Sequence, residues 1–107
     1  MRHYEFFVYI LRCSDDSYYV GVTNNLVRRL KEHEDGTAVT CYTYRRRPIA
    51  LVHSEWYQYV NDAIAREKQL KRWTRAKKEA LIRGDIEALK KHAVAYRDRG
   101  HGSAGSP

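Results

Sequence analysis

The amino-acid sequence predicts an α+β domain in which helices cover a three-stranded antiparallel sheet, in the order ββαβαα. Two observations lead to this class. Aromatic and β-branched runs separated by turn residues open the chain, as in a β-hairpin, and later segments have helical periodicity with capping residues at their ends. The length of 107 residues suits one domain with a single modest core.

The strands are indicated by composition. Residues 5–11 have almost no polar interruption, which predicts a strand buried on both faces. A turn cluster at residues 14–17 joins it to a second strand at residues 18–22, so the pair is predicted to form a hairpin. Pro48 marks the start of a third strand over residues 49–56.

The helices are indicated by their caps. Polar side chains at residues 23–25 precede a short helix over residues 26–34, and Asn61 or Asp62 caps a second helix that extends to about residue 73. Thr74 opens a third helix, which Gly84 ends.

The remaining segments give the organisation of the chain. Residues 35–47 are polar and predict a mobile loop. We expect a domain over residues 1–83, a helical extension over residues 84–96 and a disordered tail, rich in Gly and Ser, over residues 97–107.

The net charge of +7 and the tyrosine content, nine of thirteen aromatic residues, suit a nucleic-acid partner, because cations neutralise phosphates and rings stack on bases. The alternative is a protein that merely carries excess Lys and Arg.

Cys13 and Cys41 lack CxxC spacing, which argues against a disulfide framework or structural zinc and fits a reducing compartment. With no membrane-spanning run and no signal-peptide pattern, we expect a cytoplasmic protein without a membrane partner, and no obligate protein partner is inferable.

Two side chains of the first helix lie at the margin of its apolar stripe. At 100° per residue, Arg29 and His33 fall beside Leu26 and Leu30. A long cation at that margin can be held by packing while its head reaches a cleft. Alternatively, Arg29 extends over the surface and His33 simply ends the helix, favourably placed by the helix dipole.

Glu67 falls in the middle of the apolar stripe of the second long helix, three residues after Ile64 and three before Leu70. A carboxylate facing a core is unfavourable unless it is paired or bound to a metal. It is therefore either one half of a structural ion pair or a ligand for Mg²⁺ or Mn²⁺.

Two tyrosines complete the candidate set. Strand alternation places Tyr9 opposite Val8 and Ile10, and Tyr19 opposite Tyr18 and Val20. Either tyrosine could equally be a core aromatic. A further group of cations either follows a phosphate backbone or forms solvated faces; it includes Arg45, Arg46, Arg47, Lys71 and Arg75.

Together these residues resemble the GIY-YIG nuclease superfamily, in particular its small, stand-alone bacterial members. Phe7-Val8-Tyr9 corresponds to the first motif and Tyr19-Val20-Gly21 to the second. Arg29 and His33 match the pair on the following helix, and Glu67 matches the metal-binding glutamate. The sequence departs from the family at Phe7, which replaces the first glycine, and it is too short for a separate DNA-recognition domain.

The resemblance implies hydrolysis of DNA phosphodiesters with one Mg²⁺ or Mn²⁺ at Glu67, on repair or recombination structures by analogy with other members. Arg29 would stabilise the pentacovalent phosphate, and His33 would assist proton transfer or orient a tyrosine. Tyr9, rather than Tyr19, is favoured as the general base, with a pKa that the site must lower. Gly21 would let the backbone approach the phosphate.

Two other functions remain open from the sequence. One is a nucleic-acid-binding module that kept the scaffold without turnover, although a binder has no need for a carboxylate on its phosphate-facing surface. The other is a protein-interaction module whose basic face recognises an acidic partner.

Overall fold

The computed structural model of the chain describes residues 5–37 and 41–90. The chain divides into two compact units, with the boundary between Lys71 and Arg72. The first unit contains the sheet, two helices and almost all of a third. The second unit contains the helical segments that follow.

The sheet is three-stranded and antiparallel, as predicted, with the strand order β2-β1-β3. β1 comprises Phe6–Arg12, β2 comprises Tyr18–Thr23 and β3 comprises Ala50–Tyr57, each within one residue of its predicted bounds. The hairpin turn contains Asp16 with a positive φ of 65°, a conformation that Asp tolerates better than most residues. β2 is therefore an edge strand next to the central strand β1.

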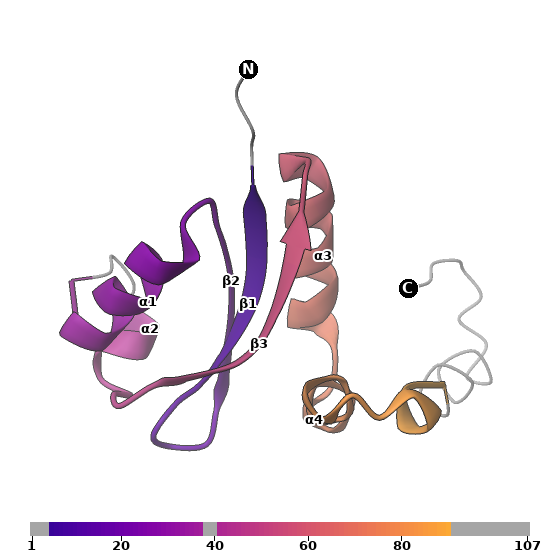
Figure 1. Ribbon diagram of the computed structural model, residues 1–107. Coiled ribbons are helices and arrows are strands. Elements are labelled where there is room, and N and C mark those ends of the chain that lie inside the picture. The colour runs from indigo at the N-terminus through magenta and orange to yellow at the C-terminus, as the bar shows by residue number, and fades with distance from the viewer. Residues whose placement is uncertain (1–4, 38–40, 91–107) are drawn as a thin grey trace. The chain divides into compact units, whose positions relative to one another are not determined.

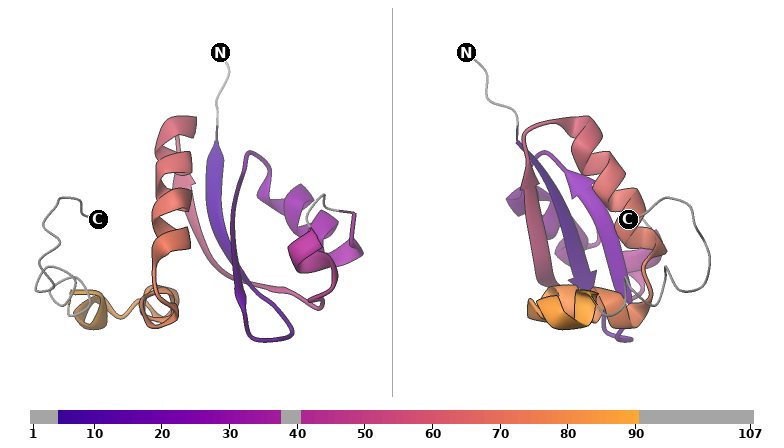
Figure 2. Two further views of the ribbon diagram at one scale, coloured as in Figure 1. Left: turned by 180° about the vertical axis from the view of Figure 1, so that it is seen from behind. Right: turned by 90° about the vertical axis from the view of Figure 1, so that its right-hand side faces the viewer.

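Helices lie on both faces of this sheet. α1, Leu26–Asp35, lies with α2, Cys41–Tyr44, on one face, and α3, Val60–Arg72, lies on the opposite face (Figures 1 and 2). This arrangement buries the central strand on both faces: Val8, Ile10 and Leu11 have no exposed area, and Tyr9 is 2% exposed. The prediction of an α+β domain with a doubly buried first strand is confirmed.

α1 begins and ends where its capping residues predict. The Asn25 side chain accepts a hydrogen bond from the backbone N–H of Arg28, and Gly36 adopts the left-handed conformation with φ of 79° after the last turn. α3 begins at Val60, before the predicted cap at Asn61 or Asp62, and ends at Arg72.

α2 corrects the prediction that residues 35–47 are a loop, since a single helical turn forms at Cys41–Tyr44. β-branched and aromatic residues are mediocre helix formers, so local propensity gives no signal here. The turn is stabilised instead by a hydrogen bond between Thr43 and His33 and by bonds to its own carbonyls. Arg46 donates to the carbonyl of Tyr42 and Arg47 to that of Tyr44, which satisfies carbonyls that the helix end leaves unpaired.

In the second unit, α4 comprises Arg75–Arg83. As predicted, the Thr74 side chain caps its start and Gly84, with φ of 71°, ends it. Residues 86–90 are helical, in agreement with the start of the predicted extension, whose remainder and the predicted tail lie outside the described residues. In the part of the chain that the structure describes, every helix is too short or too polar to cross a membrane.

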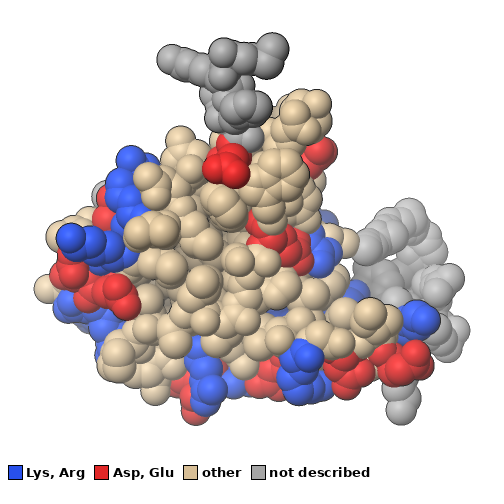
Figure 3. All heavy atoms as spheres, in the orientation of Figure 1, with Lys and Arg blue, Asp and Glu red and all other residues tan. Residues whose placement is uncertain are grey.

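Charged side chains are not uniformly distributed over the first unit. On the face in Figure 3, Lys and Arg gather together with Asp and Glu over α1 and α2, whereas the surface in front of the sheet is largely uncharged. Acidic neighbours therefore accompany the cations of this region, among them Glu32 beside Arg28 and Arg29.

Candidate active site

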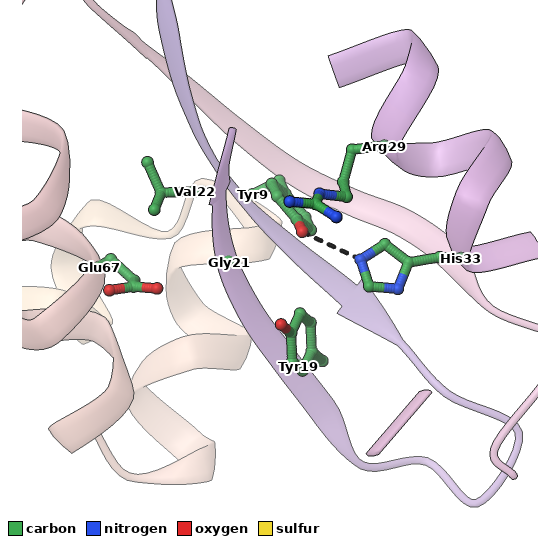
Figure 4. Close-up of a pocket in the computed structure, with 7 residues that line it drawn as sticks. All are labelled: Tyr9, Tyr19, Gly21, Val22, Arg29, His33 and Glu67. Carbon is green, nitrogen blue, oxygen red and sulfur yellow. Dashed lines mark hydrogen bonds between the residues drawn. The ribbon is translucent and has the colours of Figure 1, made fainter. Parts of the chain in front are cut away.

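A cavity of about 190 Å³ lies at the edge of the sheet, where β2 passes between α1 and α3. The five residues predicted as catalytic all line it: Tyr9, Tyr19, Arg29, His33 and Glu67. They come from four different elements, β1, β2, α1 and α3, and converge in one place (Figure 4). Gly21 and Val22 of β2 complete the lining.

His33 is the centre of a buried chain of hydrogen bonds. Its Nε2 atom lies 3.0 Å from the Tyr9 hydroxyl, and its Nδ1 atom lies 2.8 Å from Oγ1 of Thr43. Tyr9 is 2% exposed, and His33 and Thr43 are each 1% exposed. Both ring nitrogens of His33 therefore have fixed partners, which hold the imidazole in one orientation.

Burial sets the protonation states of this pair. It raises the pKa of Tyr9, nearby Tyr19 adds to the rise, and Arg29 opposes it. Burial also lowers the pKa of His33, and Arg29 lowers it further. The loss of hydration thus outweighs the nearby cation Arg29, and the lowering of the Tyr9 pKa that a general base needs stays a prediction. At neutral pH the pair consists of a neutral phenol and a neutral imidazole.

Gly21 makes the position of the Tyr9 ring possible. The two residues face each other across the β1–β2 ladder. A Cβ atom at position 21 would lie 2.5 Å from both Cζ and Oη of Tyr9, a distance at which carbon atoms clash. The glycine of the second motif is thus required by close packing of the tyrosine against the strand.

Tyr19 lines the cavity and contacts two other rings. Its ring centroid lies 5.3 Å from that of His33 and 5.8 Å from that of Tyr42. The guanidinium of Arg46 covers the Tyr42 ring at 4.0 Å and also pairs with Asp15. Tyr19 is half-buried, and packing on two sides restricts its ring.

Arg29 is held at the cavity by its own helix. Its Nη1 atom donates to Oε1 of Glu32 over 3.2 Å, and its side chain is 37% exposed. The expectation that Arg29 lies at the margin of the buried stripe, with its head at a cleft, agrees with this position. The guanidinium is close enough to influence both Tyr9 and His33 electrostatically.

Glu67 approaches the cavity from the other side of β2. In Figure 4 its carboxylate lies with Val22 on one side of the strand, and the tyrosines, Arg29 and His33 lie on the other. Its side chain is 17% exposed and forms an ion pair with Lys71 at 3.3 Å. That lysine is 54% exposed, so the pair is a surface contact rather than a buried bridge.

Glu67 is chemically suitable for one hard divalent cation. Its oxygens are of the type that Mg²⁺ and Mn²⁺ prefer, and it lines a cavity with room for water or phosphate oxygens. Within residues 5–37 and 41–90, no three His, Cys, Asp or Glu side chains gather into a metal cluster. Water and phosphate oxygens would therefore have to complete the coordination shell of a cation held by Glu67 alone.

Most of the cations predicted to contact nucleic acid have partners within the chain. Arg45 is exposed, whereas Arg46 bonds Asp15 and Tyr42, and Arg47 bonds the carbonyls of Tyr44 and Glu34. Lys71 pairs with Glu67, and Arg75, in the second unit, pairs with Glu79. A role for these five residues in binding stays a prediction.

Sequence reasoning missed Thr43 and Tyr42. Both lie in the segment assigned to a loop, and their importance depends on contacts with His33 and Tyr19, which are 10 and 23 positions away in the sequence. The one available signal was the concentration of tyrosines and threonines immediately before the Arg45-Arg46-Arg47 run.

Comparison with known families agrees with the geometry. The family model described as the GIY-YIG catalytic domain matches residues 5–80, so the chain belongs to the GIY-YIG family, a family of nucleases that bind nucleic acid.

Within it, the chain is similar to proteins named UPF0213. It is 42% identical to one from Syntrophus aciditrophicus over 83 residues, which cover 78% of this chain and 95% of the relative. Another, from Staphylococcus aureus, is 42% identical over 77 residues, covering 72% and 93%.

Two solution NMR structures have the same fold. The UPF0213 protein from Bacillus halodurans is 36% identical, with a TM-score of 0.50 over 81% of this chain and 95% of that one. A protein from E. faecalis is 33% identical, with a TM-score of 0.53 over 78% and 86%. These names specify no substrate or reaction.

Proposed function

We propose that the protein is an endonuclease that hydrolyses DNA phosphodiester bonds with one Mg²⁺ or Mn²⁺, acting on branched structures of the kind that repair and recombination produce. One observation carries the proposal. The five side chains that this chemistry requires converge on a single cavity from four separate elements. A purely structural role for each of them would not bring a carboxylate, a guanidinium and two phenols to the same solvent-accessible space.

Glu67 would hold the divalent cation, whose charge would neutralise the scissile phosphate and the leaving oxygen. The Lys71 ammonium now pairs with this carboxylate, so the cation would compete with Lys71 for it. Because the lysine of that pair is exposed, the competition costs little free energy.

Arg29 would stabilise the charge that develops on the phosphate. Its guanidinium lines the cavity and is held by Glu32, so it needs little reorganisation when substrate arrives. A single donor aimed at developing charge contributes about 10²–10³-fold in rate. Tyr19 lines the same cavity and offers a hydroxyl to a phosphate oxygen or to the attacking water.

Tyr9 would accept the proton of the attacking water. Since burial raises the pKa of Tyr9, little free phenolate exists at neutral pH. The hydrogen bond to His33 offers a different route, in which Tyr9 passes its own proton to Nε2 while it accepts one from water. A neutral imidazole is required for this transfer, and burial favours the neutral form.

The test is cleavage of labelled DNA by the full chain with Mg²⁺, Mn²⁺ or a chelator. The panel contains single-stranded, duplex, flap and branched DNA, and RNA. Cutting should require metal, should prefer a branched or flap substrate, and should fall at least about 10²-fold in Arg29→Ala and disappear in Glu67→Gln.

Two neighbouring substitutions serve as matched controls. Arg28→Ala removes one positive charge from the same helix turn, and Asp62→Asn removes one negative charge from α3, yet neither residue lines the cavity. Both variants should cut like the wild type. A wild type that binds the panel in a salt-dependent way but leaves every substrate intact with either metal would refute the proposal in favour of a binding module.

A further inference from the structure

The single helical turn α2 supplies a residue to the candidate site that the proposed chemistry has not used. Thr43 is 1% exposed, and its Oγ1 atom lies 2.8 Å from Nδ1 of His33. It does not line the cavity. Thr43 therefore touches neither substrate nor water there, and acts only through the imidazole.

The two hydrogen bonds of His33 are coupled through its tautomer. A neutral imidazole has one N–H donor and one lone-pair acceptor, so the nitrogen that faces Thr43 and the nitrogen that faces Tyr9 play opposite roles. Either Nδ1–H donates to Thr43 and Nε2 accepts from Tyr9, or the Thr43 hydroxyl donates to Nδ1 and Nε2–H donates to Tyr9. Only the first arrangement leaves His33 able to receive a proton from Tyr9.

We propose that Thr43 is a positioning residue that accepts a hydrogen bond from Nδ1–H of His33 and so holds the tautomer in which the Nε2 lone pair faces the Tyr9 hydroxyl. This inference rests on the proposed function and specifies how its general base operates. As water forms its bond to phosphorus, the bond from phosphorus to the leaving sugar oxygen breaks, the water proton moves to Tyr9 Oη and the Tyr9 proton moves to Nε2. The leaving oxygen takes a proton from solvent. The product is an imidazolium whose two N–H groups donate to Tyr9 and Thr43.

The charges around the pair act in both directions, since Arg29 disfavours and Glu32 favours a protonated His33. Four other polar or charged groups face the pair: Tyr19 from β2, Arg29 and Glu32 from α1, and Glu67 from α3. Within the described residues, the Tyr9 hydroxyl forms its hydrogen bond with His33, so its buried hydrogen is satisfied when it donates to Nε2. In the opposite tautomer that hydrogen would depend on water in the cavity.

The first test is the ¹⁵N NMR spectrum of the full chain with labelled histidine. The His33 ring should show a protonated Nδ1 and a lone pair on Nε2, with the resonances assigned by their absence from a His33→Gln sample. Thr43→Val keeps the shape of the side chain and removes the acceptor for Nδ1–H, so its spectrum should shift to the Nε2–H tautomer. A wild-type spectrum with protonated Nε2 would overturn the inference.

The second test is cleavage kinetics. Thr43→Val should lower kcat by about 10²-fold, the lower range for loss of general-base catalysis, and leave KM unchanged. Thr43→Ser keeps the hydroxyl and should restore wild-type kcat. Thr37→Val removes a hydroxyl from an exposed residue near the end of α1 and is the matched control, expected to be fully active.

The outcomes separate this inference from the proposed function. If the wild type cuts and Thr43→Val cuts equally well, the role of Thr43 is wrong while the nuclease stands. If the wild type cuts nothing, the nuclease and its proton transfer are wrong, and the nitrogen spectrum still decides the tautomer. Should Thr43→Val not fold, the wild-type spectrum and the kcat of Thr43→Ser carry the decision.

Discussion

Replacing Glu55 by Gln should lower the free energy of unfolding by about 3 kcal/mol at pH 7. Glu55 joins β3 to α3, because Arg66 donates to both of its carboxylate oxygens, at 2.8 and 3.0 Å. Tyr57 also donates to it at 2.8 Å, and His53 Nε2 lies 2.8 Å from Oε2. The side chain is 18% exposed, so these contacts are poorly screened.

The magnitude follows from the pKa of this carboxyl. Burial alone would raise it, but hydrogen bonds from His53, Arg66 and Tyr57 outweigh burial and lower the pKa of Glu55 from 4.5 to about 2. Each pH unit of displacement is worth about 1.4 kcal/mol, which gives about 3 kcal/mol. Since the folded pKa is depressed, this stabilisation is present in full above pH 4.5 and is lost as the pH falls towards 2.

The assay is urea unfolding followed by far-ultraviolet circular dichroism at several pH values between 7 and 3. The difference between wild type and Glu55→Gln should shrink from about 3 kcal/mol at pH 7 to about 1.4 kcal/mol at pH 3. Glu34→Gln, at an exposed carboxylate of α1, is the control and should change stability by less than about 0.5 kcal/mol. A Glu55→Gln difference that is the same at both pH values would refute the reasoning.

Three further substitutions probe the cavity. Gly21→Ala should displace the Tyr9 ring, lowering stability by about 1–3 kcal/mol in thermal melts and abolishing cleavage; a variant with normal activity would contradict the close packing. Tyr42→Ala should free the Tyr19 ring and lower kcat, whereas Tyr42→Phe should preserve it, and equal kcat values would contradict a role for the ring. Lys71→Ala should release Glu67 and lower the Mg²⁺ concentration for half-maximal cleavage by about twofold; an increase would instead assign Lys71 to substrate binding.

Local signals account for the parts of the fold that the sequence predicts well. The caps at Asn25, Thr74 and Gly84 act within a few residues of themselves, so their helices are bounded correctly. The strands of the hairpin are equally local. Glu67 can be identified from the sequence because a carboxylate interrupts an apolar stripe. Its position near buried Leu70 is consistent with that stripe. Val60, at the start of the stripe, is nevertheless 43% exposed.

The missed features depend on contacts between distant residues. α2 has no propensity of its own and forms where Thr43 meets His33 and where two arginines bond its carbonyls. The extent to which burial raises the pKa of Tyr9 is not predictable for a related reason, because motif spacing indicates which groups are near but not how much water each one loses. Neither the formation of α2 nor the extent of desolvation at Tyr9 can be read from a pattern of residue types.

The hairpin turn determines which residues of β2 face the cavity, although no residue of the turn lines it. Gly21 and Val22 are consecutive on an edge strand, one under the Tyr9 ring and the other towards Glu67. A slip of one residue between β1 and β2 would turn every side chain of β2 to the opposite face and put a valine under Tyr9. The turn at residues 14–17, with Asp16 in its left-handed conformation, therefore sets the register that places Gly21 under the Tyr9 ring. A change in the length of this turn would shift the register and so change which side chains of β2 face the cavity.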